Sequence, residues 1–277
     1  MTYSRASLRR FLSGAVLALL LPDLAFAEEP KPQTGHPSEQ SLQAQATNPN
    51  APLIQMSVFN TFVPSSYGGE GYSNQLLIQP VIPIAAQSWF PVAQILRPSL
   101  PILTTPGPDR VTGLGDFAFF DVFVPDHYPW GSWGLGVTAV FPTATDDRLG
   151  AGKWQLGPAA TLLFQGIENL QLGMILQNPI SFAGDGDRPG VNMLLFQPIA
   201  QYNLPKGWYV GMGDFTWLFD WKDDGAATIP LALQVGRVLP FLGQQWNLGL
   251  EGAYTVVHPG PAPRWSIRLG ISLLLPK

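Results

Sequence analysis

The sequence contains no cysteine and few charged residues. The absence of cysteine excludes a disulfide framework and thiolate metal sites. Only 12% of the residues are charged, whereas a soluble domain usually carries about 25%. Since the apolar content of 46% is ordinary, the shortage of charge indicates a large surface that does not meet water.

Several functional signatures are also missing. The net charge is −4, so no basic patch indicates nucleic acid as a partner. The only histidines are His36, His127 and His258, and no pair has a metal-ligand spacing such as H-E-x-x-H. There is no G-x-S-x-G elbow, and no histidine lies in a strand-like run beside a candidate serine nucleophile. We therefore expect no enzyme activity, no metal and no cofactor.

The N-terminal 27 residues are predicted to be a secretory signal peptide. A basic stretch that ends at Arg10 precedes an apolar segment over 11–21, and Ala25-Phe26-Ala27 is a cleavage motif. No later apolar run is long enough for a spanning helix, which needs about 18 residues or more. An exported, charge-poor chain without a spanning helix indicates an outer-membrane β-barrel.

Residues 28–52 are rich in Gln, Pro, Asn, Ser and Thr and have few large apolar side chains. This composition predicts a disordered periplasmic tail. The alternative is a segment that folds back into a pore as a plug.

The C-terminal part of the chain alternates in steps of two residues. The apolar positions are Trp265, Ile267, Leu269, Ile271 and Leu273, and the intervening ones are Arg264, Ser266, Arg268, Gly270 and Ser272. Because successive side chains of a strand point to opposite faces, this pattern predicts a strand with one apolar and one polar face.

Similar runs recur about twelve times, each near the roughly 9–11 residues with which a tilted strand crosses a bilayer. They cover approximately 53–63, 73–86, 91–103, 113–124, 131–143, 154–166, 169–181, 191–204, 207–219, 226–239, 244–257 and 264–275.

The connections between the runs alternate in length. Those after odd-numbered runs are longer and polar, such as Ala144–Lys153, and those after even-numbered runs are mostly tight, such as Pro205-Lys206. Long extracellular loops and short periplasmic turns are typical of outer-membrane barrels. Most tryptophans lie near run ends, as in the aromatic girdles of such barrels.

Prolines inside the runs count against regular central strands. We expect bulges or local distortions of the ladder at Pro80, Pro83, Pro98, Pro101, Pro198 and Pro230.

The alternation also predicts which polar side chains face the lumen. A Lys or Arg facing lipid at mid-depth would cost about 2–4 kcal/mol, so charges in the runs are expected to point inward. The candidate lumen-lining residues are Gln75, Gln79, Arg97, Asp116, Gln197, Gln201, Asp214, Gln234, Asn247, Glu251, Arg264 and Arg268. These side chains either pair across a filled interior or line a polar constriction that selects solutes.

The Ala144–Lys153 loop carries Asp146, Asp147, Arg148 and Lys153. It is either a solvated outer loop or a gate that folds inward.

Five stretches resemble a known family. They are FPTATDDRLGAGKWQLGP over 141–158, GLGD over 113–116, YNLPKGWY over 202–209, with Gln197-Pro198 shortly before it, QVGRV over 234–238 and LLLPK over 273–277. Over most of Leu53–Lys277 the chain resembles the outer-membrane family named for the MetA pathway of phenol degradation. The resemblance implies a barrel and the passage of small or aromatic compounds.

We therefore expect an all-β protein: a transmembrane antiparallel up-and-down β-barrel of about twelve strands over residues 53–277, with both termini periplasmic, in the outer membrane of a Gram-negative bacterium. The predicted function is a passive channel or facilitator for small molecules, including hydrophobic or aromatic ones. Its expected partners are outer-membrane lipid, small-molecule solutes and the outer-membrane assembly machinery. The alternatives are a structural or adhesion barrel with a packed interior and a secreted soluble β-sandwich.

Overall fold

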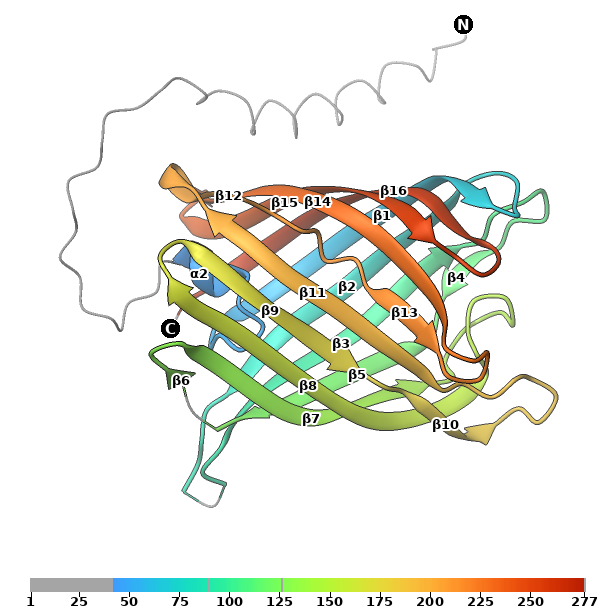
Figure 1. The fold of residues 1–277 in the computed structure, drawn as a ribbon, viewed down its shortest axis with the longest axis horizontal. Helices are drawn as coiled ribbons and strands as arrows, with labels where there is room; N and C mark the ends of the chain where they lie inside the picture. Colours follow the sequence, from blue (N-terminus) through green and yellow to red (C-terminus); the bar gives the residue numbers. More distant parts are fainter. Residues whose placement is uncertain (1–41, 89, 126, 277) are drawn as a thin grey trace, which may run out of the picture. The chain divides into compact units, whose positions relative to one another are not determined.

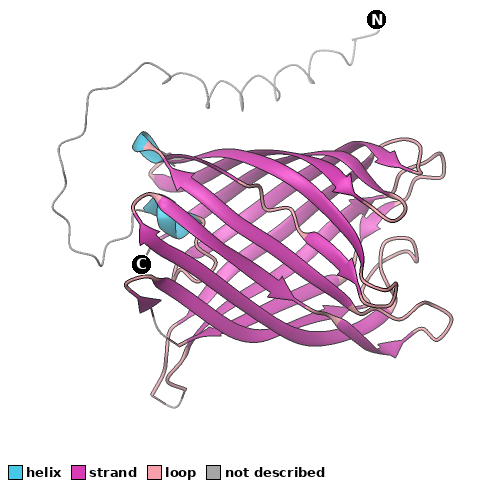
Figure 2. Ribbon diagram, in the orientation of Figure 1, coloured by secondary structure: helices cyan, strands magenta, loops and turns pink. Residues whose placement is uncertain are grey.

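One antiparallel sheet closes on itself into a barrel of 12 strands in the computed structural model (Figures 1 and 2). The structure describes residues 42–88, 90–125 and 127–276. The predicted all-β barrel is confirmed. The only α-helix in these ranges, α2 (Leu42–Ala46), has five residues, and no helix there is long and apolar enough to cross a bilayer.

The strands follow one another around the barrel in chain order. They are β1 (Ile54–Tyr67), β2 (Ser73–Ile84), β3 (Ala93–Thr104), β4 (Thr112–Leu114), β5 (Phe117–Val124), β6 (His127–Tyr128), β7 (Gly131–Phe141), β8 (Lys153–Ile167), β9 (Leu170–Gln177), β10 (Ile180–Gly184), β11 (Met193–Asn203), β12 (Trp208–Gly211), β13 (Trp217–Asp220), β14 (Ala226–Phe241), β15 (Gln244–Val257) and β16 (Ala262–Leu275). The pairs β4 and β5, β9 and β10, and β12 and β13 each form one interrupted wall strand, while β6 extends the turn before β7. Antiparallel pairing of β16 with β1 closes the barrel.

The two faces of the wall differ in polarity, as the alternation predicts. In β1, Met56 is 49% exposed on the outer face, whereas the neighbouring Gln55 is 8% exposed and points inward. Large apolar side chains such as Leu135 and Ile271 are likewise exposed on the outside. The barrel therefore has an apolar exterior and a largely polar lumen, the arrangement that a bilayer requires.

The long loops and the short turns lie at opposite ends of the barrel (Figure 1). Ile54 at the start of β1 pairs with Leu275 at the end of β16, so both ends of the barrel sequence lie at one rim. The turn with a 3-10 helix at Pro205–Gly207 lies at this rim, close to α2. The Ala144–Lys153 loop lies at the opposite rim.

Several of the prolines inside the strands coincide with gaps in the ladder. The pairs Ile78↔Leu100 and Ile82↔Leu96 flank a gap between β2 and β3 in which Pro80 lies opposite Pro98. Pro230 follows a register shift in β14. Proline has no N–H to donate, so it loses no hydrogen bond where the ladder is interrupted. The expected distortions are confirmed at Pro80, Pro98 and Pro230. They are wrong for Pro83, Pro101 and Pro198, which pair in register with the neighbouring strand.

The segment over 42–52 differs from the predicted disordered tail, because it is packed inside the short-turn end of the barrel. Asn50 is 1% exposed. Its amide donates to Ser132 Oγ (3.0 Å) and accepts from Thr161 Oγ1 (2.7 Å). A polar segment can be ordered here because the lumen supplies hydrogen-bond partners that low hydrophobicity in the sequence does not reveal. The predicted signal peptide and residues 28–41 of the predicted tail lie outside the described residues.

The packing around Tyr209 generates a test of the short-turn end. Tyr209 is 1% exposed, and a Cβ added at Gly236 would overlap its ring. We expect Gly236→Ala to destabilise the folded barrel by about 1–3 kcal/mol through overpacking. Gly252→Ala is the matched control, because nothing lies within 4 Å of a Cβ at that position. Denaturant unfolding of both variants in detergent micelles checks this, and equal losses of stability would contradict it.

Candidate functional site

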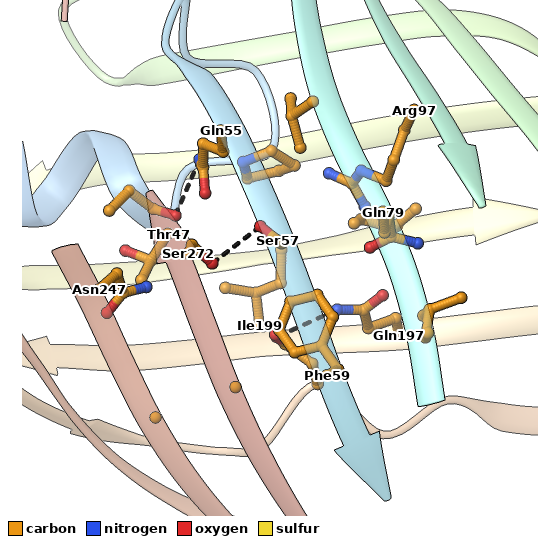
Figure 3. Close-up of a pocket in the computed structure, with 18 of the residues that line it drawn as sticks. Thr47, Gln55, Ser57, Phe59, Gln79, Arg97, Gln197, Ile199, Asn247 and Ser272 are labelled. Carbon is orange, nitrogen blue, oxygen red and sulfur yellow. Dashed lines mark hydrogen bonds between the residues drawn. The ribbon is translucent and has the colours of Figure 1, made fainter. Parts of the chain in front are cut away.

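A central cavity of about 260 Å³ occupies the lumen next to the 42–52 segment (Figure 3). Ala46, Thr47, Asn48 and Pro49 form its floor at the short-turn end. Its walls come from strands all around the barrel and carry both polar and aromatic side chains: Gln55, Ser57, Phe59, Gln79, Arg97, Phe120, Gln177, Gln197, Gln201, Gln234, Asn247, Glu251 and Arg268. The cavity is therefore polar with apolar patches.

The 42–52 segment is held to the wall by side chains of several strands. Thr47 Oγ1 donates to Gln171 Oε1 (3.0 Å) and accepts from Gln201 Nε2 (2.7 Å). Gln43 donates to the carbonyl of Trp208. Together with the Asn50 bonds, these contacts close much of the lumen at the short-turn rim.

Residues 212–216 leave the wall between β12 and β13 and fold toward the lumen. The ladder between β11 and this wall strand stops at Phe196↔Trp217 and resumes at Gln201↔Gly211. Met212, Asp214 and Thr216 line the central cavity, and Phe215 lines a second cavity beyond it. This inward segment narrows the lumen at mid-height.

Arg268 holds the inward segment against β16, three strands away around the wall. Its guanidinium donates to the carbonyl of Asp214 (3.2 Å) and lies over the ring of Phe215, 4.4 Å from the centroid. It also lies 3.7 Å from a carboxylate oxygen of Glu251 and donates to Thr61 Oγ1 (3.1 Å). The same Glu251 oxygen accepts the backbone N–H of Asp214 (3.0 Å). The Arg268–Glu251 ion pair and the inward segment are therefore joined by hydrogen bonds and together form one constriction of the lumen.

The register explains how these groups meet. Gln234 pairs with Glu251, Glu251 with Arg268, Arg268 with Thr61, and Thr61 with Gln75. Directly opposed residues on neighbouring strands point to the same face of the sheet. One polar row therefore crosses five neighbouring strands, from β14 through β15, β16 and β1 to β2.

The second cavity, of about 380 Å³, lies between this constriction and the long loops. Thr216 and Arg268 line both cavities. Arg148 and Leu149 of the Ala144–Lys153 loop also line the second one. The lumen thus consists of two chambers that meet at Arg268.

The structure places ten of the twelve predicted lumen residues on the cavity walls. The central cavity is lined by Gln79, Arg97, Gln197, Gln201, Asp214, Gln234, Asn247, Glu251 and Arg268, and the second by Gln75 and Arg268.

Asp116 and Arg264 line neither cavity. Asp116 lies between β4 and β5, where its carboxylate accepts the backbone N–H groups of Ala144 (3.2 Å) and Ala151 (2.6 Å). Arg264 has the inward parity of β16, but it is exposed, and its guanidinium lies over Tyr67. Alternation predicts the face of a side chain but not its height along the barrel, which explains the error for Arg264.

The Ala144–Lys153 loop folds over the mouth of the barrel. Leu149 is 4% exposed and points into the second cavity. Arg148 pairs with Asp146 (3.0 Å) and lowers the pKa of that carboxyl to about 2 through side-chain and backbone hydrogen bonds. The ion pair of Asp147 with Arg188 (3.8 Å) and the bond from Lys153 to the Asp185 carbonyl connect this loop to the one after β10.

Sequence reasoning missed Asn50, Phe215 and Tyr209 as residues of the lumen. Tyr209 donates to Asn247 Oδ1 (2.8 Å) and packs against the 42–52 segment. An alternating pattern could have placed Tyr209 inward, but no local signal shows that residues 212–216 leave the wall.

These features define the class of the fold: a closed antiparallel barrel of 12 strands that matches an outer membrane channel fold. A similar solved structure is described as the COG4313 outer membrane channel from Pseudomonas putida F1. The TM-score is 0.61 at 14% sequence identity, and the match covers 89% of this chain and 100% of that chain. No family model and no curated protein matches the sequence. At this identity the likeness concerns the fold.

The two bonds to Asp116 generate a test of the loop. We expect Asp116→Ala to speed tryptic cleavage at Arg148 or Lys153 about tenfold or more, because two backbone N–H groups lose a charged acceptor. Glu70→Ala is the control, since it removes an exposed carboxylate from the loop after β1 and lies far in sequence from both cleavage sites. Limited proteolysis of the purified barrel measures both, and equal cleavage rates in the two variants would contradict the role of Asp116.

Proposed function

We propose that the protein is an outer-membrane channel for the passive passage of small molecules. The observation that carries this proposal is the pair of cavities that meet at Arg268 and extend through the lumen from the 42–52 segment to the long loops. An apolar exterior around a polar, hollow interior suits diffusion of solutes through a membrane protein.

The cellular setting of the proposal follows from the sequence and the fold together. The signal-like N-terminus favours export, and the apolar exterior favours outer-membrane lipid as the surroundings. The short-turn rim would then face the periplasm and the long loops the outside. Insertion of such a barrel would involve the outer-membrane assembly machinery.

The lining limits the solutes to small ones. A cavity of about 260 Å³ is just below the size of typical ligand pockets, which span roughly 300–1,000 Å³. Phe59 and Phe120 lie among the polar side chains of its walls. They supply apolar surface for hydrophobic or aromatic solutes, which the resemblance to the phenol-degradation family also favours.

A structural or adhesion barrel with a closed interior is the second candidate. The observation that favours it is the set of hydrogen bonds by which Thr47 and Asn50 hold the 42–52 segment in the lumen. Permeability separates the two functions.

We expect the purified full chain to admit small solutes into liposomes and to conduct ions across planar bilayers. Cross-linking Asn50→Cys to Ser132→Cys with a short bis-methanethiosulfonate, which forms a disulfide with each thiol and releases methanesulfinate, should lower permeability, because it fixes the 42–52 segment to the wall. Reduction should restore the permeability. The chain has no other cysteine, so the reagent has one target pair.

The matched control is Met56→Cys with Leu273→Cys, which joins opposed residues of β1 and β16 on the outer face of the barrel and leaves the segment free. Its permeability should stay near that of the wild type. A full chain that leaves bilayers sealed, with or without the cross-link, would reject the channel in favour of the closed barrel.

A further inference from the structure

Arg97 lies where the wall of the barrel is interrupted between β2 and β3. In that gap Gln79 lies opposite Ser99, Pro80 opposite Pro98 and Val81 opposite Arg97, and none of these pairs belongs to the ladder. The facing prolines cannot donate hydrogen bonds across the two strands. The gap is bridged by a side-chain bond instead, from Gln79 Nε2 to Ser99 Oγ (2.7 Å).

The Arg97 side chain points into the central cavity beside Gln79 (Figure 3). On its other side β3 pairs with β5, which places Phe120 directly opposite Arg97. The guanidinium carbon lies 5.3 Å from the centroid of the Phe120 ring. A cation, an amide and an aromatic ring are therefore gathered on one wall of the cavity.

Among the residues that the structure describes, none makes a hydrogen bond or a salt bridge with Arg97, and the Asp214 carboxylate attracts it only from a longer distance. Its Nε is buried from solvent and makes no hydrogen bond. Arg268, three strands away on β16, instead contacts Glu251, Thr61 and the Asp214 carbonyl. A buried guanidinium without an anion is unfavourable, and this favours binding of one.

The carboxylates of the cavity do not supply that anion. Glu251 is engaged by Arg268 and by the backbone N–H of Asp214. The Asp214 carboxylate accepts a hydrogen bond from Gln197 Nε2 (3.2 Å). Neither Glu251 nor Asp214 makes a salt bridge with Arg97. The cavity therefore keeps one cationic group that no carboxylate of the described residues contacts directly, which leaves room for an anion from outside the chain.

We propose that Arg97, Gln79 and Phe120 form a subsite for the carboxylate of a small organic anion with an apolar or aromatic body. The guanidinium presents parallel N–H donors that fit a carboxylate. Phe120 packs against the guanidinium, and Phe59 and Ile199 line the same cavity for the apolar body. The inference rests on the proposed channel function and names a solute class for it.

The test compares benzoate with its neutral analogue benzamide. Binding to the full chain in non-ionic detergent is measured by titration calorimetry, and uptake into liposomes is measured with labelled solutes. We expect the wild type to favour benzoate over benzamide by about tenfold in affinity, the factor that one charge-assisted contact supplies. Arg97→Met should remove that preference, and Arg97→Lys should keep part of it.

Arg237→Gln is the matched control. It removes the same charge from a side chain that lies against Trp208, outside the lining of either cavity. It should leave the preference for benzoate unchanged. A wild type that binds both probes equally, or an Arg97→Met variant that keeps the preference, overturns the subsite.

The outcomes separate the subsite from the channel. Uptake of both probes without an Arg97-dependent preference rejects the subsite and leaves the channel function intact. Arg97-dependent binding of benzoate in detergent, with liposomes that stay sealed to every solute, supports the subsite and rejects the channel.

Discussion

The structure depends on one constraint, which is that the backbone of a strand exposed to lipid must find its hydrogen-bond partners in other strands. Pairing of β16 with β1 satisfies this constraint for the first and the last strand of the sheet. The wall is broken only in places, such as the β2–β3 gap and residues 212–216. In the β2–β3 gap the prolines have no N–H that needs a partner, and a side-chain hydrogen bond joins the two strands. Residues 212–216 instead turn inward, away from the lipid. These irregular places shape the two chambers.

Much of the fold could be predicted because its signals are local. The period of two places Glu251 and Arg268 on one face, and the structure pairs them directly. The sorting of loops by length separates the two rims. The rule that charges point inward fails at Asp121, which pairs with the outward-facing Val137 and so lies on the outer face. A period of two fixes relative faces within a strand, and only packing fixes which face is inside.

The candidate site was predictable only in part, because its shape depends on contacts far apart in the sequence. Asn50 is ordered by Ser132 and Thr161, and no pattern in residues 28–52 shows those partners. Asp116 looked like a lumen charge but organises a loop 28 residues later in the chain. A segment of polar composition is disordered in water, but it can be ordered inside a polar lumen that supplies hydrogen-bond partners.

The polar row from Gln234 to Gln75 crosses the seam between the last strand and the first. A slip of one residue at that seam would turn Thr61 and Gln75 to the face opposite Arg268 and would break the hydrogen bond from Arg268 to Thr61. Such a misaligned closure would bring polar side chains of β1 and β2 to the lipid face. The polar row that borders the lumen therefore also specifies the alignment in which the last strand joins the first.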